Sequence, residues 1–224
     1  MSTNFGKEDG VFIRIMTMDD YEKIGENIYN EEPLKLAMDN YLKIEPNQSQ
    51  KDEVEEYHHS MVKQGTCLVA INDENGGDIV GSVLAGCETL SNLQECYAQV
   101  AAMEEGYYKT CTIFEFETKI KGNYFDRYGV SKVLYSHMTN VDASHRGKGL
   151  GARLAAALME LGRSKGFPIM IACCTSLYTA RQKEALGMEC IYSQAYADYK
   201  DANGQVVFKP PAPHTHVRVM AIKL

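Results

Sequence analysis

A short glycine-rich segment constrains the fold of this 224-residue chain more than any other. The run Lys132 to Val141 has the apolar, β-branched character of a strand, and the Ala- and Leu-rich run Leu150 to Lys165 is typical of a helix. Between them the chain reads Arg-Gly-Lys-Gly-Leu-Gly over residues 146–151. The pattern predicts a strand, a glycine loop and a helix in succession, with the loop at the helix N-terminus.

Such a loop suits a bulky anion. Glycines at alternate positions carry no Cβ, so backbone N–H groups can close around the ligand, and the positive end of the helix dipole favours negative charge. Arg146 and Lys148 add full charges. The helix dipole contributes only about 0.3–1 kcal/mol per interaction to anion binding. The two cations and several N–H groups must therefore supply the rest of the binding free energy. We expect a phosphate or pyrophosphate ligand, the alternative being an ordinary glycine-rich turn.

Two other phosphate-binding loops fit less well. The Walker pattern requires Ser or Thr after Gly-Lys to hold magnesium, and Gly149 stands there instead. The dinucleotide fingerprint requires Gly-x-Gly-x-x-Gly, whereas Gly147, Gly149 and Gly151 are each two residues apart.

The segment resembles the coenzyme A pyrophosphate loop of the GNAT superfamily of N-acetyltransferases, Gln/Arg-x-x-Gly-x-Gly/Ala, which Arg146, Gly149 and Gly151 match. The resemblance implies acetyl-CoA as co-substrate. It also implies that backbone N–H groups at Asn140 and Val141 hold the carbonyl oxygen of the acetyl group. The residues that we expect to contact the coenzyme are Asn140, Val141, Arg146, Gly147, Lys148, Gly149, Leu150, Gly151, Ala152, Ser176 and Thr179.

Composition narrows the class of protein. With 45% hydrophobic and 24% charged residues, residues 1–224 are expected to form one domain. A net charge of −7 argues against nucleic acid or an acidic membrane surface as partner and mildly favours cationic small molecules. We find no signal peptide and no apolar run near the ~20 residues of a membrane span. We therefore expect a cytoplasmic monomer, with its seven cysteines as free thiols.

The order of elements indicates a mixed α/β fold of about seven strands. The expected strands are 11–17, 66–71, 79–90, 132–141, 169–174, 191–199 and 217–224, and the expected helices cover 19–30, a stretch from 34, 54–65, 93–108, 113–128, 150–165 and 177–186. The Asn-Gly pair at 75–76 predicts a hairpin. The GNAT resemblance implies that the fourth and fifth strands, ending near Val141 and Cys174, splay apart to admit the thioester.

Acetyl transfer to an amine requires a base, because a primary amine with a pKa near 10 is protonated at neutral pH. The candidate is Glu32, although by sequence position alone Glu31-Glu32 is more typical of a solvated acidic pair at a helix start. Four segments resemble the insect arylalkylamine (dopamine) N-acetyltransferases, a likeness that runs from Glu32 to Ala221. They are the Glu-Pro-Leu motif at 32–34, the loop at 146–151, and the segments at 175–181 and 197–210. The resemblance implies that Glu32 is the general base.

That family also places two serine hydroxyls after the fifth strand as partners in proton transfer, and Thr175 and Thr179 occupy their positions. A compatible alternative makes Thr175 or Ser176 the N-cap of the next helix. Many GNAT enzymes carry a tyrosine before a Gly-Phe pair to protonate the departing thiolate. Here the positions before Gly187-Met188 hold Lys183 and Glu184, so that role is unfilled.

Other chemistries are less well supported. Cys173 and Cys174 lie in an apolar strand with no histidine nearby in sequence, which disfavours a thiolate nucleophile. His58-His59 are expected on a polar helix face, and no histidine has the acidic or thiol partners of a metal site. We expect no metal.

The sequence therefore predicts an N-acetyltransferase working by direct attack in a ternary complex. The expected acceptor is an arylalkylamine such as dopamine, serotonin, octopamine or tyramine. One alternative is a polyamine or agmatine acceptor, and another is a GNAT-like module that binds acetyl-CoA without turnover.

Overall fold

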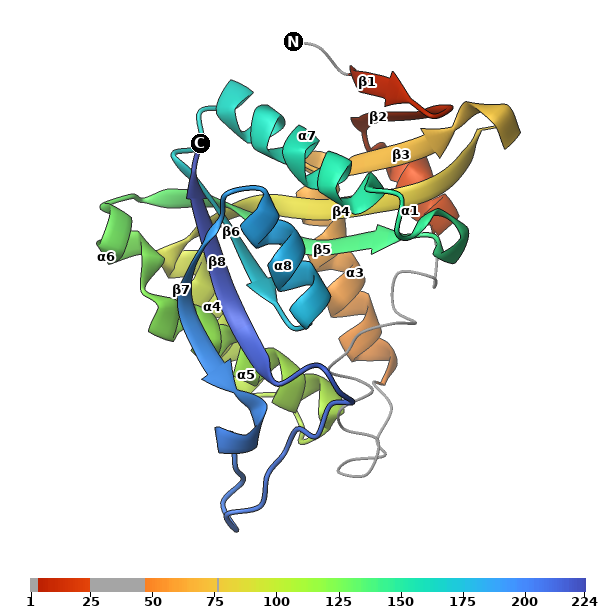
Figure 1. Ribbon diagram of the computed structural model, residues 1–224. Coiled ribbons are helices and arrows are strands. Elements are labelled where there is room, and N and C mark those ends of the chain that lie inside the picture. Colours follow the sequence, from red (N-terminus) through yellow and green to blue (C-terminus); the bar gives the residue numbers. More distant parts are fainter. Residues whose placement is uncertain (1–3, 25–46, 76) are drawn as a thin grey trace.

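The computed structural model describes residues 4–24, 47–75 and 77–224, and its centre is one eight-stranded sheet in the order β1-β2-β3-β4-β5-β6-β8-β7 (Figure 1). The strands are β1 (Asn4–Glu8), β2 (Val11–Ile15), β3 (Leu68–Asn72), β4 (Asp78–Thr89), β5 (Lys132–Val141), β6 (Ile169–Cys174), β7 (Glu189–Ala195) and β8 (His216–Lys223). Neighbouring strands are antiparallel except β5 and β6, which are parallel. The predicted mixed α/β fold is confirmed.

Helices pack on both faces of the sheet (Figure 1). They are α1 (Met18–Ile24), α3 (Gln48–Lys63), α4 (Leu90–Ala101), α5 (Tyr107–Gly122), α6 (Tyr124–Tyr128), α7 (Leu150–Ser164) and α8 (Leu177–Ala185). Side chains of α7 and α8 share one buried cluster with Leu134 and Ala172, while side chains of α1, α3 and α4 share a second cluster with Tyr135 and Ile171. Alternate residues of β5 and β6 therefore face opposite layers, as the pleat requires.

One strand, β1, was not expected from the sequence. It pairs antiparallel with β2 at the edge of the sheet, with Lys7 opposite Phe12 and Glu8 opposite Val11. A strand at a sheet edge tolerates charged residues, which discourage pairing with other chains. Because residues 4–8 are mostly polar, they lack the apolar pattern that predicts a strand. With β1 the sheet has eight strands instead of about seven.

The helices predicted over 93–108 and 113–128 have different boundaries. The hydroxyl of Thr89 accepts a hydrogen bond from the N–H of Asn92 at 3.2 Å, so α4 begins at Leu90. The helix ends at Ala101. Helix α5 begins at Tyr107, after Gly106, and ends at Gly122, because the next residue, Asn123, has a left-handed φ of 43°. The cap at the start of α4 and the left-handed residue at the end of α5 are local features that the apolar pattern alone did not reveal.

The strands β5 and β6 part along their length. They pair only at Leu134–Met170, Tyr135–Ile171 and Ser136–Ala172, although β5 continues to Val141 and β6 to Cys174. The two arrows diverge toward their C-terminal ends (Figure 1). A register shift on the opposite edge of β5, where Met138 faces Leu84 but Ser136 faces Ala85, leaves His137 as the extra residue of a bulge. A bulge bends the strand that carries it, and this bend accounts for the divergence of β5 from β6 after Ser136.

Candidate active site

The glycine loop follows the free end of β5. The N–H of Asp142 donates to the carbonyl oxygen of Val80 at 2.9 Å, and the carboxylate of Asp142 accepts from the N–H of Ser144 at 2.9 Å. A 3₁₀ turn, Ala143–His145, comes next. The Nε of Arg146 donates back to the carbonyl oxygen of Val141 at 2.9 Å. These bonds fold the loop tightly onto the strand that precedes it.

Helix α7 begins without a side-chain cap. Its N-cap residue is Gly149, in the left-handed region at φ 81°, and Gly147 has φ 74°. A Cβ built at Gly149 would meet none of the described atoms within 4 Å, so the space beside this residue is open. The first-turn N–H groups of α7 thus receive no acceptor from the N-cap side chain, as an anion site at a helix start requires.

Gly151 serves a different purpose. A Cβ there would lie 2.4 Å from the side-chain nitrogen of Gln182 in α8. The side chain of Gln182 therefore lies against the first turn of α7, beside the glycine loop.

That segment forms the start of α8. Ser176 is the N-cap, since its hydroxyl accepts from the N–H of Thr179 at 3.1 Å and lies 2.9 Å from the hydroxyl of Thr179. The hydroxyl of Tyr196 donates to the carbonyl oxygen of Thr175 at 2.6 Å, and the N–H of Leu177 donates to Nδ1 of His214 at 3.1 Å. The predicted N-cap is confirmed at Ser176, and the catalytic roles of Thr175 and Thr179 stay predictions.

The predicted base is not part of this geometry. Glu32, with the Glu-Pro-Leu motif around it, lies outside the described residues. Asn140 and Val141 lie at the end of β5, paired on one side with Ser82 and Gly81 of β4.

Burial argues against a cysteine nucleophile. Burial raises the pKa of Cys174 to about 12, and burial with the nearby Glu115 carboxylate raises that of Cys173 well above its usual range. Both thiols are therefore protonated at neutral pH. Lys183, at one of the positions before Gly187-Met188, is 1% exposed, and its Nζ has no hydrogen-bond partner in the structure.

A histidine pair appears where the sequence predicted a polar helix face. His58 of α3 is 1% exposed, so that expectation is wrong for it. Its Nε2 lies 3.3 Å from Nε2 of His137, and its Nδ1 lies 3.0 Å from the hydroxyl of Tyr21. These residues are too far apart in sequence for any local pattern to bring them together. Within the described parts of the chain, no group of three or more His, Cys, Asp or Glu residues could hold a metal ion.

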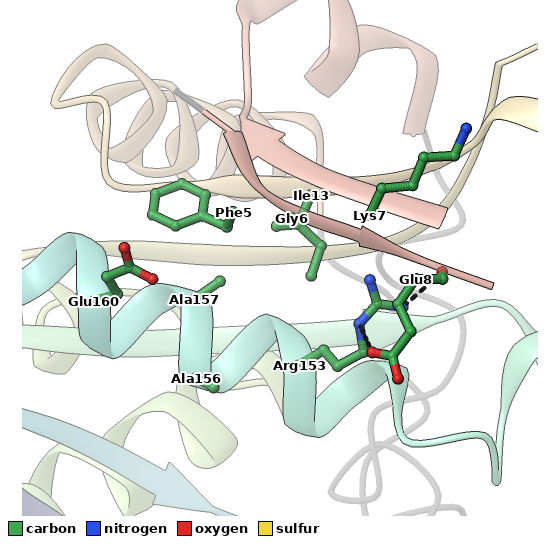
Figure 2. A pocket seen from close by; sticks show the side chains of 9 residues that line it. All are labelled: Phe5, Gly6, Lys7, Glu8, Ile13, Arg153, Ala156, Ala157 and Glu160. Carbon is green, nitrogen blue, oxygen red and sulfur yellow. Dashed lines mark hydrogen bonds and ion pairs between the residues drawn. The ribbon is translucent and has the colours of Figure 1, made fainter. Parts of the chain in front are cut away.

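A separate hollow of about 280 Å³ lies between β1 and α7 (Figure 2). Arg153 crosses it and donates to the carbonyl oxygens of Glu8 at 3.2 Å and Val11 at 2.9 Å, with an ion pair to the Glu8 carboxylate at 3.1 Å. These contacts anchor the first turns of α7 to the sheet. None of the predicted site residues lines this hollow.

In the described ranges no helix combines the length and apolar character needed to cross a membrane.

Comparisons with known proteins agree with this geometry. A model of the acetyltransferase (GNAT) family matches residues 30–183. The Drosophila melanogaster polyamine N-acetyltransferase, which catalyses the formation of N-acetylagmatine, is 28% identical, with a TM-score of 0.82 over 96% of this chain and 100% of the other.

Two arylalkylamine enzymes are similar to the same degree. A mosquito arylalkylamine N-acetyltransferase, like 5b, is 26% identical, with a TM-score of 0.83 over 96% of this chain and 100% of the other. Arylalkylamine N-acetyltransferase 2 from Aedes aegypti is 25% identical, with a TM-score of 0.82 over 96% and 99%. The sheet, the glycine loop and the family match together establish that the chain belongs to the GNAT acetyltransferase family.

Proposed function

We propose that this protein transfers the acetyl group of acetyl-CoA to the primary amine of an arylalkylamine, by direct attack in a ternary complex. The observation that carries the proposal is the start of α7. An uncapped helix N-terminus and two left-handed glycines follow the strand that parts from its parallel neighbour. Main-chain amides arranged in this way suit a pyrophosphate.

The residues of this chain would divide the work between the two substrates. Backbone groups of residues 146–152 bind the coenzyme phosphates, helped by the charges of Arg146 and Lys148, and Ser176 and Thr179 lie at the start of the neighbouring helix α8. The coenzyme supplies the acetyl group as a thioester. The N–H groups at Asn140 and Val141 stabilise the oxyanion, a type of contact that lowers a barrier by roughly 3–4 kcal/mol.

Proton transfer falls to side chains. A primary ammonium must lose a proton before its nitrogen can attack, and Glu32 is the proposed acceptor of that proton. Thr175 and Thr179 are the proposed hydroxyl partners. The hydroxyl of Thr179 already lies in a hydrogen bond with that of Ser176.

Two acceptor classes are supported by specific observations. Structures of arylalkylamine enzymes match at 25% and 26% identity, and the resemblance at Glu32-Pro33-Leu34 favours that class. The polyamine enzyme matches at 28%, and the net charge of −7 suits a polycationic acceptor. A polyamine or agmatine is therefore the second candidate.

The test is a panel of dopamine, serotonin, octopamine and tyramine against agmatine and spermidine, scored by thiol release from acetyl-CoA and by the mass of the product. We expect the highest kcat/KM for an arylalkylamine. A preference for agmatine or spermidine supports the second candidate. Binding of acetyl-CoA by calorimetry without turnover of any amine would identify a coenzyme-binding module and overturn the proposed reaction.

A further inference from the structure

Glu115 of α5 lies where β5 and β6 begin to separate. Its carboxylate accepts a hydrogen bond from the hydroxyl of Tyr135, one of the three residues of β5 that pair with β6. It is also near Cys173, the first residue of β6 beyond that pairing, because its charge contributes to the raised pKa of the thiol after burial. Tyr135 and Phe116 belong to the cluster on the face opposite α7 and α8 (Figure 1). The carboxylate therefore lies at the closed end of the gap, on the face opposite the glycine loop.

This position gains its meaning from the proposed function, on which the inference rests. A coenzyme whose pyrophosphate binds at the start of α7 reaches the gap from the face of α7 and α8. The amine must reach the thioester carbon from the other face, because the coenzyme fills the first. The proposed place of the acetyl carbonyl is near Asn140, and Tyr135 lies five residues back along β5, toward the closed end. Glu115 is therefore placed to meet the far end of an acceptor rather than its amine.

The carboxylate of Glu115 has room for one more hydrogen bond. Its Oε1 accepts from Tyr135, whereas Oε2 accepts from no residue in the described ranges and is not enclosed by the protein. The side chain is partly exposed, and none of the cations in those ranges forms an ion pair with it. A carboxylate can accept several hydrogen bonds, and bonds to an ionised oxygen are roughly twice as strong as those between neutral groups.

A buried network holds the carboxylate in this orientation. Nζ of Lys119 lies 3.7 Å from the ring centre of Tyr135, and the same ammonium pairs with Glu88 of β4. The hydroxyl of Tyr124 donates to Glu88 at 2.5 Å. Burial, followed by the nearby Glu115 carboxylate, holds the pKa of Tyr135 well above its usual range, so its phenol keeps the proton that it donates. Glu115 is thus fixed by a rigid helix and a packed partner, as selective recognition requires.

Aromatic rings lie beside the carboxylate. The ring of Tyr57 on α3 is 36% exposed and lies within electrostatic reach of Glu115. The rings of Tyr57 and Tyr135 both contact the ring of His137, with centroids 5.5 and 5.7 Å apart. Aromatic rings pack favourably edge to face, so this wall suits an aryl group better than the flexible chain of a polyamine.

We propose that Glu115 recognises the ring hydroxyl of a phenolic arylalkylamine, which donates to Oε2 while Tyr135 donates to Oε1. The bond from Tyr135 is itself an example of a phenol donating to this carboxylate. Dopamine, serotonin, octopamine and tyramine all carry a hydroxyl on the ring. Glu115 therefore gives these amines an advantage over phenethylamine and tryptamine, which lack that hydroxyl.

The experiment compares tyramine with phenethylamine, which differ only in the ring hydroxyl, by kcat/KM in wild type, Glu115→Leu and Glu115→Gln. We expect wild type to favour tyramine at least tenfold, as one hydrogen bond to a charged group allows. Glu115→Leu should lower kcat/KM for tyramine about tenfold and leave that for phenethylamine within threefold, so the preference disappears. Glu115→Gln keeps an oxygen acceptor without the charge, and about threefold preference should remain.

Glu117→Leu is the matched control. Glu117 lies two residues further along α5 and is also partly exposed, but the hydroxyl of Tyr135 donates to Glu115 instead. Its preference for tyramine should equal that of wild type. Tyr135→Phe removes the bond that orients Glu115, and it should lower the preference about threefold without changing kcat for phenethylamine.

A third amine tests the hydrogen-bond donor without any mutation. 4-Methoxyphenethylamine keeps the ring oxygen of tyramine and lacks its proton. A wild-type kcat/KM close to that for phenethylamine supports the proposal, and one close to that for tyramine overturns it. Thermal unfolding shows whether each variant is folded. If Glu115→Leu is not, Glu115→Gln decides: a reduced preference supports the role of Glu115, and an unchanged preference overturns it.

The outcomes separate this proposal from the proposed function. Wild type that acetylates no amine overturns the proposed function and the role of Glu115 with it. Wild-type activity with equal kcat/KM for tyramine and phenethylamine, or with the preference unchanged in Glu115→Leu, overturns the role of Glu115 alone. A fall in kcat/KM confined to agmatine and spermidine in both Glu115 variants would assign this carboxylate to a second cation and overturn recognition of the hydroxyl.

Discussion

Glu32 is the residue on which the proposed reaction most directly depends. Glu32→Gln keeps the size of the side chain and removes its basicity, so we expect kcat at pH 7 to fall about 100-fold. The loss should shrink as pH rises toward the pKa of the amine, because the acceptor then deprotonates by itself. Steady-state kinetics from pH 6.5 to 9.5 measures this.

The neighbouring Glu31→Gln provides the control for that variant. It removes the same charge one residue away and should leave kcat within twofold. Calorimetry should give equal affinity for acetyl-CoA in both variants. An unchanged rate in Glu32→Gln would remove Glu32 as the base.

Gly149 tests the coenzyme site. Gly149→Val places a β-branched side chain in the open space at the start of α7 and at a φ of 81°, where such residues are strained. We expect at least tenfold weaker binding of acetyl-CoA by calorimetry, since the side chain occupies the approach to the first-turn amides.

Strain alone could weaken the fold, so a second glycine separates the two effects. Gly204 has φ 76°, and a Cβ there would also meet none of the described atoms within 4 Å, but it lies in the turn between Asp201 and Gln205. Gly204→Val should cost similar stability and leave coenzyme affinity unchanged. Equal affinity in Gly149→Val and wild type would contradict the loop assignment.

At the scale of the element, the start of α8 combines a structural and a proposed chemical role. Ser176→Ala removes the oxygen that accepts from the N–H of Thr179. We expect a loss of about 1 kcal/mol in the free energy of unfolding, the usual effect of losing an N-cap. Urea unfolding measures it. Ser176→Asn, which keeps a capping acceptor, should recover most of the stability, and equal destabilisation by Asn and Ala would argue against a capping role.

Element boundaries follow the same local chemistry. Helix α3 starts at Gln48 because Asn47 and Gln50 form a reciprocal capping box, with bonds of 2.9 and 3.1 Å. The apolar pattern placed this helix only from about Val54. The capping box is visible in the sequence as Asn-x-x-Gln over residues 47–50, but these residues precede the apolar stripe that begins at Val54.

At the scale of the whole molecule, the buried histidine pair makes stability depend on pH. Burial lowers both pKa values in the folded state, to about 3 and about 4, so between pH 6.5 and 4 the unfolded chain binds more protons than the folded one. The contribution of the two histidines to the free energy of unfolding is therefore complete above pH 6.5 and falls as pH drops from 6.5 toward 4. We expect a loss of roughly 2–3 kcal/mol for each histidine, about 5 kcal/mol for the pair, between pH 7 and pH 4.5 in urea unfolding.

In a variant with both His58→Gln and His137→Gln, the free energy of unfolding should fall less between pH 7 and pH 4.5, because its folded and unfolded states differ less in bound protons. Asp20 does not interfere. Its bonds to Arg14 and Thr17 lower the pKa of its carboxyl below the usual value, so its contribution is lost only below about pH 4. Equal pH dependence in wild type and the double variant would contradict the shifts assigned to the histidines.

The sequence by itself determined the parts whose information is local. The strand that ends at Val141, the glycines at 147–151 and the helix from Leu150 are adjacent in the chain, and their spacing, apolar period and lack of side chains carry the prediction. The resemblance to the GNAT family, confirmed by the family match, rested on those same adjacent residues.

The tertiary structure decided what depends on residues distant in sequence. Only the folded sheet reveals the bulge at His137, because it arises from the register between β4 and β5. Only packing of α1 and α3 against β5 brings Tyr21, His58 and His137 into one hydrogen-bonded chain. No period or spacing within a segment encodes these contacts, because each partner comes from a different element and meets the others only when both layers close on the sheet.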